Sequence, residues 1–143
     1  MSIHRFLLLA ALSMLFAAGA WAETLAELTA KAEKGDAESQ FNLGKLYMDG
    51  DGAEVKKDTT AAAKWLIKSS EQNYGEAQRM LAGLYKNGVG VDKDPVAALM
   101  WIKLAVANNT ANADRLEKLY TAGLTRDQVA EATKKAADWK PVK

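Results

Sequence analysis

The chain has 143 residues, with 19 lysines and arginines against 18 aspartates and glutamates, one histidine and no cysteine. The balanced charge argues against nucleic acid or an anionic membrane as a partner, because both require excess positive charge. Without cysteine the fold has no disulfide, so it must be held together by packing alone.

Residues 1–22 have the pattern of a cleavable signal peptide. Arg5 precedes an apolar run from Phe6 to Phe16, which is shorter than the roughly 20 apolar residues of a transmembrane helix. Ala20-Trp21-Ala22 then provides a small-x-small cleavage site. We therefore expect cleavage after Ala22, a periplasmic or secreted protein without stable membrane insertion, and a single domain over residues 23–143. An uncleaved N-terminal anchor is the alternative.

The only histidine, His4, lies inside this predicted signal peptide. The mature chain would then contain neither imidazole nor thiol. This removes Ser-His-Asp and Cys-His catalysis, ordinary zinc and copper sites, and pH switching by histidine. We expect no catalytic residue, no metal and no cofactor.

The first predicted element of the mature chain is a capping helix over residues 24–35. Leu25, Leu28 and Ala32 lie on one side of it, and Gly35 follows. Beyond it the chain repeats: Leu43-Gly44-Lys45-Leu46-Tyr47 recurs as Leu81-Ala82-Gly83-Leu84-Tyr85 and as Leu116-Glu117-Lys118-Leu119-Tyr120. Apolar residues at i, i+3 and i+4 indicate a helix.

A second helical element alternates with the first. Ala61-Ala62-Ala63-Lys64-Trp65-Leu66 reappears as Ala97-Ala98-Leu99-Met100-Trp101-Ile102. Asp36 and either Asp58 or Thr59 can cap the helices of the first pair, and Asp94-Pro95 opens the second helix of the next pair. Thr125 and Gln128 form a capping box before a last helix. These boundaries predict repeat 1 at 36–74, repeat 2 at 75–110, a half repeat at 111–123 and a C-terminal capping helix at 125–139.

These motifs resemble the Sel1-like repeat, a relative of the tetratricopeptide repeat. The better copy runs from Leu81 to Asn109 with Gly88-Val89-Gly90-Val91, Asp94-Pro95 and Trp101, whereas the copy from Leu43 to Asn73 has a longer turn and Thr59 in the proline position. The resemblance implies an all-α fold, a short α-solenoid of helix-turn-helix repeats. Residues expected in the repeat core are Leu43, Gly44, Tyr47, Trp65, Leu81, Ala82, Tyr85, Trp101 and Tyr120. Gly44 and Ala82 would allow close helix approach, and Trp65 and Trp101 would fill the space between successive pairs.

Other segments resemble phosphate-binding, calcium-binding or catalytic sites but have simpler structural interpretations. The Gly-x-Gly sequences at Gly50 and Gly88 follow helices and lack a following Gly-Lys-Ser/Thr, so they are read as turns and not as phosphate loops. The acidic turn that starts at Asp49 has Thr60 where an EF-hand needs glutamate. Asp94 is read as a helix cap and not as half of a catalytic carboxylate pair with Asp92.

The remaining candidate is a surface. In this repeat class the first helix of each pair lines the inner, concave curve of the solenoid, and the flanking positions there form a predicted partner-binding face of Phe41, Lys45, Met48, Arg79, Lys86 and Lys118. Apolar residues beside basic ones suit an acidic or amphipathic peptide. The leading interpretation is a non-enzymatic periplasmic adaptor or scaffold for a protein or peptide of the cell envelope. The alternatives are an inhibitor or immunity protein for an exported toxin or enzyme, a carboxylate-based hydrolase, and an ordinary solvated face.

Overall fold

The computed structural model describes residues 24–142, so the predicted signal peptide lies outside the described residues. Within 24–142 the chain forms helices and no strand, which confirms the all-α fold class. The helices are α2 (Leu25–Glu33), α3 (Ala37–Asp49), α4 (Thr59–Glu71), α5 (Gly75–Asn87), α6 (Pro95–Ala107), α7 (Ala113–Thr121) and α8 (Arg126–Asp138). None of these helices is long and apolar enough to cross a membrane.

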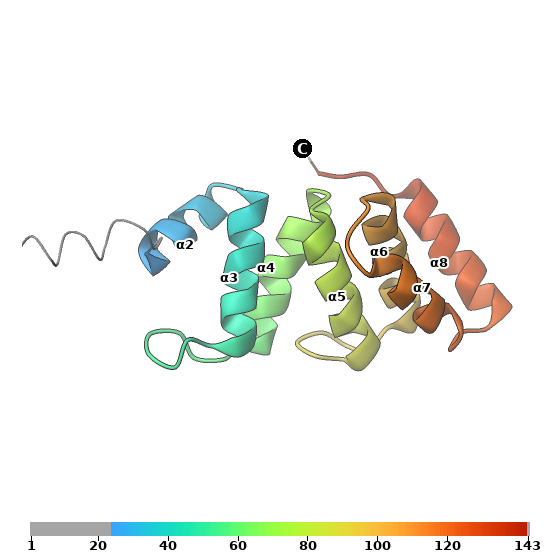
Figure 1. The fold of residues 1–143 in the computed structure, drawn as a ribbon, viewed down its shortest axis with the longest axis horizontal. Coiled ribbons are helices and arrows are strands. Elements are labelled where there is room, and N and C mark those ends of the chain that lie inside the picture. Colours follow the sequence, from blue (N-terminus) through green and yellow to red (C-terminus); the bar gives the residue numbers. More distant parts are fainter. Residues whose placement is uncertain (1–23, 143) are drawn as a thin grey trace, which may run out of the picture.

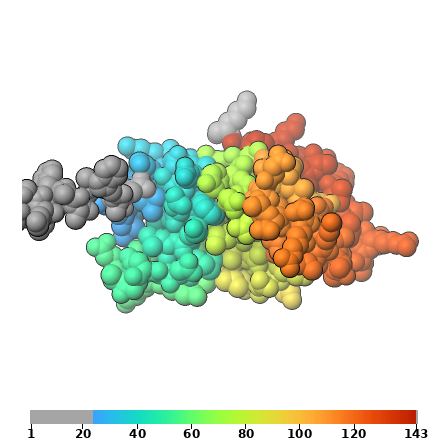
Figure 2. Space-filling view, viewed as in Figure 1, coloured from blue at the N-terminus to red at the C-terminus, as the bar shows by residue number. Residues whose placement is uncertain are grey.

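The helices stack in pairs along one direction (Figure 1). α3 packs on α4 and α5 packs on α6, while α2 on α3, α4 on α5 and α6 on α7 join successive units. The stack forms one continuous elongated body, with the N-terminal helices at one end and α8 at the other (Figure 2). This is the short solenoid expected from the repeated motifs.

The two full units begin their second helices in the same way. Asp58 and Asp94 are N-caps with nearly identical backbone angles, and their carboxylates accept hydrogen bonds from the amides of Ala61 and Ala97, both at 2.9 Å. The amide of each aspartate also donates to a tyrosine carbonyl of the preceding helix, Tyr47 in one unit and Tyr85 in the other. Because a cap satisfies amides that otherwise lack partners, each aspartate fixes both the start of its helix and its distance from the preceding one.

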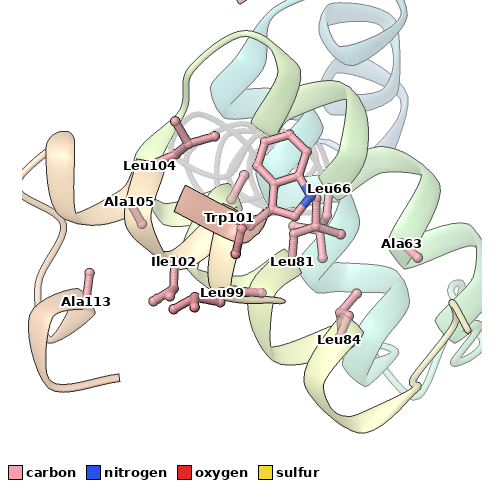
Figure 3. Packing of buried hydrophobic residues seen from close by; sticks show 13 residues of the cluster. Ala63, Leu66, Leu81, Leu84, Leu99, Trp101, Ile102, Leu104, Ala105 and Ala113 are labelled. Carbon is pink, nitrogen blue, oxygen red and sulfur yellow. The ribbon is translucent and has the colours of Figure 1, made fainter. Parts of the chain in front are cut away.

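The core lies between the pairs and is built from fully buried leucine, isoleucine and alanine side chains. Figure 3 shows Leu66 of α4, Leu81 of α5, and Leu99 and Ile102 of α6 in this cluster. Leu43, Gly44 and Ala82 are buried as expected, and Tyr85 and Tyr120 pack half-buried against the cluster.

The two repeated tryptophans, Trp65 and Trp101, differ in how far they are buried. Trp101 is 8% exposed, and its ring meets the edge of Trp139 at a centroid distance of 6.0 Å. Trp65 is half-buried and lies outside the core cluster, as does Tyr47, so the expectation that both tryptophans fill the space between pairs is wrong for Trp65. The cause is α8, whose main contact is with α6 and not with α4.

A buried glutamine links each first helix to the helix before it. The side-chain amide of Gln40 donates to the carbonyl of Ala32 at 3.0 Å, and that of Gln78 donates to the carbonyl of Ser70 at 3.2 Å. Ala32 lies on α2 and Ser70 on α4, so the two bonds are equivalent in successive units. The N-terminal capping helix α2 therefore occupies the place of a second helix from an incomplete preceding unit.

A pair of glycine substitutions tests this stacking. Gly52 and Gly90 occupy corresponding turns and have φ of +76° and +69°, but a Cβ on Gly90 would lie 2.0 Å from the carbonyl oxygen of Thr59, whereas a Cβ on Gly52 would meet nothing within 4 Å. We expect Gly52→Ala to cost about 1–2 kcal/mol from backbone conformation. Gly90→Ala should cost about 1–3 kcal/mol more from overpacking. Urea unfolding of both variants measures the difference, and equal losses would contradict the contact between units.

The two tryptophans give a second matched pair. Trp101→Ala removes a buried ring and should lower the free energy of unfolding by about 3–5 kcal/mol. Trp65→Ala removes a half-buried ring from outside the core and should cost about 1 kcal/mol. Thermal melting of the two variants provides the measurement, and a Trp65 variant as damaged as the Trp101 variant would contradict the described packing.

Candidate functional site

The predicted binding residues lie on the three first helices, α3, α5 and α7, which are side by side in the stack (Figures 1 and 2). We call this surface the first-helix face. Its positions are Phe41, Lys45 and Met48 on α3, Arg79, Gly83 and Lys86 on α5, and Asp114, Lys118 and Thr121 on α7. Contacts between side chains of neighbouring helices make it continuous.

An aromatic pair joins α3 to α5 on this face. The ring centroids of Phe41 and Tyr74 are 5.3 Å apart at an interplanar angle of 42°, and both rings are half-buried. The ammonium of Lys45 lies 5.5 Å from the centroid of Phe41, within the range of a cation–π interaction. Phe41, a residue of the predicted binding face, is therefore partly covered by Tyr74 and Lys45. Lys45 itself is exposed.

Tyr74 was not predicted from the sequence. It is the N-cap residue of α5 and makes no side-chain cap, whereas the corresponding residue before α3 is the capping Asp36. Partial burial raises the pKa of Tyr74, and the negative charges of Glu38, Glu76 and Asp36 raise it further. The phenol is therefore neutral at physiological pH and stands in an acidic environment at the beginning of the first helices.

A second contact joins α5 to α7. The ammonium of Lys86 lies 5.3 Å from the ring centroid of Tyr120. Gly83 lies next to this ring, and a Cβ there would lie at an ordinary van der Waals distance, 3.8 Å, from the Tyr120 hydroxyl oxygen. Burial raises the pKa of Tyr120, and the positive charge of Arg79 opposes this in part. Tyr120, which was predicted to be a core residue, therefore packs against the core and also contributes to the first-helix face.

The charges on the face follow the helix direction. Glu38, Glu76 and Asp114 lie in the first turns of α3, α5 and α7, and Lys86 and Lys118 lie in last turns. This order is favourable for the helix dipole. Arg79 forms an ion pair with Glu76 at 3.0 Å, so its charge is already balanced. Lys45 and Lys118 are exposed on the same surface.

The acidic residues that the sequence singled out serve the local structure of their turns. Residues 24–142 contain no group of three or more histidine, aspartate or glutamate side chains that could hold a metal ion. The Asp51 carboxylate accepts the amides of Ala53 and Val55, both at 2.8 Å, and so closes its own turn. Asp94 caps α6, as the sequence indicated.

Comparison with known proteins identifies the repeat. A family model for the Sel1 repeat matches residues 37–74 and 75–109. The chain belongs to the Sel1 repeat family. Members of this family are typically scaffolds for protein–protein interaction and are generally not enzymes. Comparison with curated proteins gave no significant match.

Two solved structures are similar to this Sel1 repeat protein. One is a protective antigen present in uropathogenic Escherichia coli strains and displaying an SLR fold, with 32% identity and a TM-score of 0.75 over 80% of this chain. The other is a Sel1 repeat protein from Oxalobacter formigenes, with 28% identity and a TM-score of 0.63 over 66% of this chain. The matches span 24% and 27% of those two chains, so this chain corresponds to about a quarter of either relative.

Proposed function

We propose that this Sel1 repeat protein is a non-enzymatic adaptor that binds a segment of a partner protein on the first-helix face. The observation that supports this most directly is the continuity of the face from α3 to α7, maintained by the Phe41–Tyr74 and Lys86–Tyr120 contacts. Half-buried aromatic rings beside exposed lysines provide apolar area together with positive charge.

The partner that suits this face is an extended or helical segment with apolar and acidic side chains. Apolar groups would pack beside Phe41, Tyr74 and Met48, and carboxylates would pair with Lys45 and Lys118. Arg79 is less available because Glu76 already holds it. The acidic first turns would repel a carboxylate, so the negative end of the segment should lie toward the C-terminal ends of the first helices.

Charge reversal tests the face. Lys45→Glu combined with Lys118→Glu should reduce recovery of partner proteins from an envelope extract about tenfold or more, because each reversal replaces an attraction by a repulsion. The measurement is affinity purification with quantitative mass spectrometry.

Lys56→Glu combined with Lys57→Glu is the matched control, because both lysines are exposed in the loop before α4 and the net charge changes equally. Recovery that is undiminished in the first variant places the binding surface elsewhere. The absence of any partner above background for the unchanged protein contradicts the adaptor function.

We also propose that the protein acts in the periplasm or outside the cell. The support is the pattern of residues 1–22, with Arg5, the apolar run and the Ala20-Trp21-Ala22 site. N-terminal sequencing of the protein purified from a periplasmic fraction should give Glu23 as its first residue. An intact Met1 in the membrane fraction would instead show that the segment is retained as an anchor.

A further inference from the structure

Trp65 lies in an apolar surface pocket on α4, away from the first-helix face. The pocket has a volume of about 380 Å³ and is lined by Ala61, Lys64, Trp65, Ile67 and Lys68. All five residues belong to the second helix of the first unit. A half-buried indole offers apolar area that a partner could bury, and tryptophan is enriched at protein interfaces for this reason.

The chain itself shows how the equivalent ring is covered one unit later. Trp101 occupies the corresponding position on α6, and the Trp139 ring meets it at an interplanar angle of 70°. This edge-to-face arrangement is a preferred geometry for aromatic pairs. α8 and the residue that follows it thus cover α6. The segment after them reaches the end of α4, where the amide of Val142 donates to the carbonyl of Glu71 at 2.9 Å, and Trp65 stays half-buried in its surface pocket.

The residues around the two rings differ in charge. One residue before and three residues after Trp101 on α6 stand Met100, which is half-buried, and Leu104, which is 8% exposed. The corresponding positions beside Trp65 are Lys64 and Lys68, both exposed, and the Lys68 ammonium lies 4.4 Å from the Trp65 ring centroid. No acidic side chain lines the pocket. An apolar helix face of the kind that α8 packs on α6 is therefore a poor cover here, and a second copy docked by the same patch would bring lysines together.

We propose that the Trp65 pocket is a second docking site, which binds a helical segment of an acidic partner protein. An aromatic side chain of that segment packs against Trp65 as Trp139 packs against Trp101, and carboxylates on both sides of it pair with Lys64 and Lys68. This site is independent of the first-helix face, so one protein can hold two segments at once.

Calorimetric titration of the protein with three synthetic helical peptides tests the proposal. The peptides share one central tryptophan and differ only in the residues four positions before and after it, which are glutamate, glutamine or lysine. The glutamate peptide should bind about tenfold more tightly than the glutamine peptide, the expected sum of two exposed ion pairs. The lysine peptide should bind more weakly than both.

Three variants locate the binding. Trp65→Ala should weaken binding of the glutamate peptide about tenfold or more, with an unchanged circular dichroism spectrum as the check on folding. Lys64→Gln combined with Lys68→Gln should make the three peptides nearly equal. Lys56→Gln combined with Lys57→Gln, which removes the same charge from a nearby loop, should change nothing.

Four results would overturn the proposal: no binding of the glutamate peptide at millimolar concentration, equal affinities for the three peptides, retention of binding in Trp65→Ala, or loss of binding in Lys45→Glu with Lys118→Glu. The last result would assign the peptide to the first-helix face. Sedimentation analysis completes the test, because self-association that Trp65→Ala abolishes would show that a second copy covers the pocket.

Discussion

The close approach of the two helices within each unit is the constraint on which the rest of the structure depends. A Cβ on Gly44 would lie 2.8 Å from Cγ of Leu66, a fully buried residue of α4. The corresponding Ala82 of α5 is also completely buried. Because the chain has no cysteine to cross-link its helices, this contact and the packing between units must supply the stability. Small residues at these two positions are therefore required for a two-helix unit to form.

The same position carries a different kind of residue in α7. In α7 the corresponding residue is Glu117, whose carboxylate pairs with the Lys103 ammonium of α6 at 2.7 Å. α7 packs on α6 as α5 packs on α4, so the ion pair adds to a packing that the preceding unit reaches without one. α8 then packs on α6 and brings Trp139 over Trp101. α7 therefore carries a charged residue where α3 and α5 have a small one, and the helix that follows it, α8, covers one of the two repeated tryptophans.

Much of this architecture could be predicted from the sequence because the deciding features are local. Capping by Asp58, Asp94 and Thr125 needs only neighbouring residues, and the Leu-x-x-Leu-Tyr spacing indicates a helical face directly. The docking of α8 on α6 could not be predicted, since its apolar residues fit several neighbours equally well. Trp65 was misplaced for the same reason: its identity matches that of Trp101, but its burial depends on a helix from another part of the chain. The repeated glutamine three residues before Leu43 and Leu81 was a detectable pattern that indicated the links to α2 and α4.

The size of the first-helix face bears on the kind of partner proposed for it. A standard protein–protein interface uses about 20–30 residues on each side. The first-helix face offers three positions on each of three helices, and several of these, such as Arg79 and Lys86, already interact within the chain. A surface of this size suits a short segment better than the surface of a folded domain. A binding module built from two full units therefore gains affinity most readily by using more than one of its faces, because two weak contacts to linked segments reinforce each other through effective concentration.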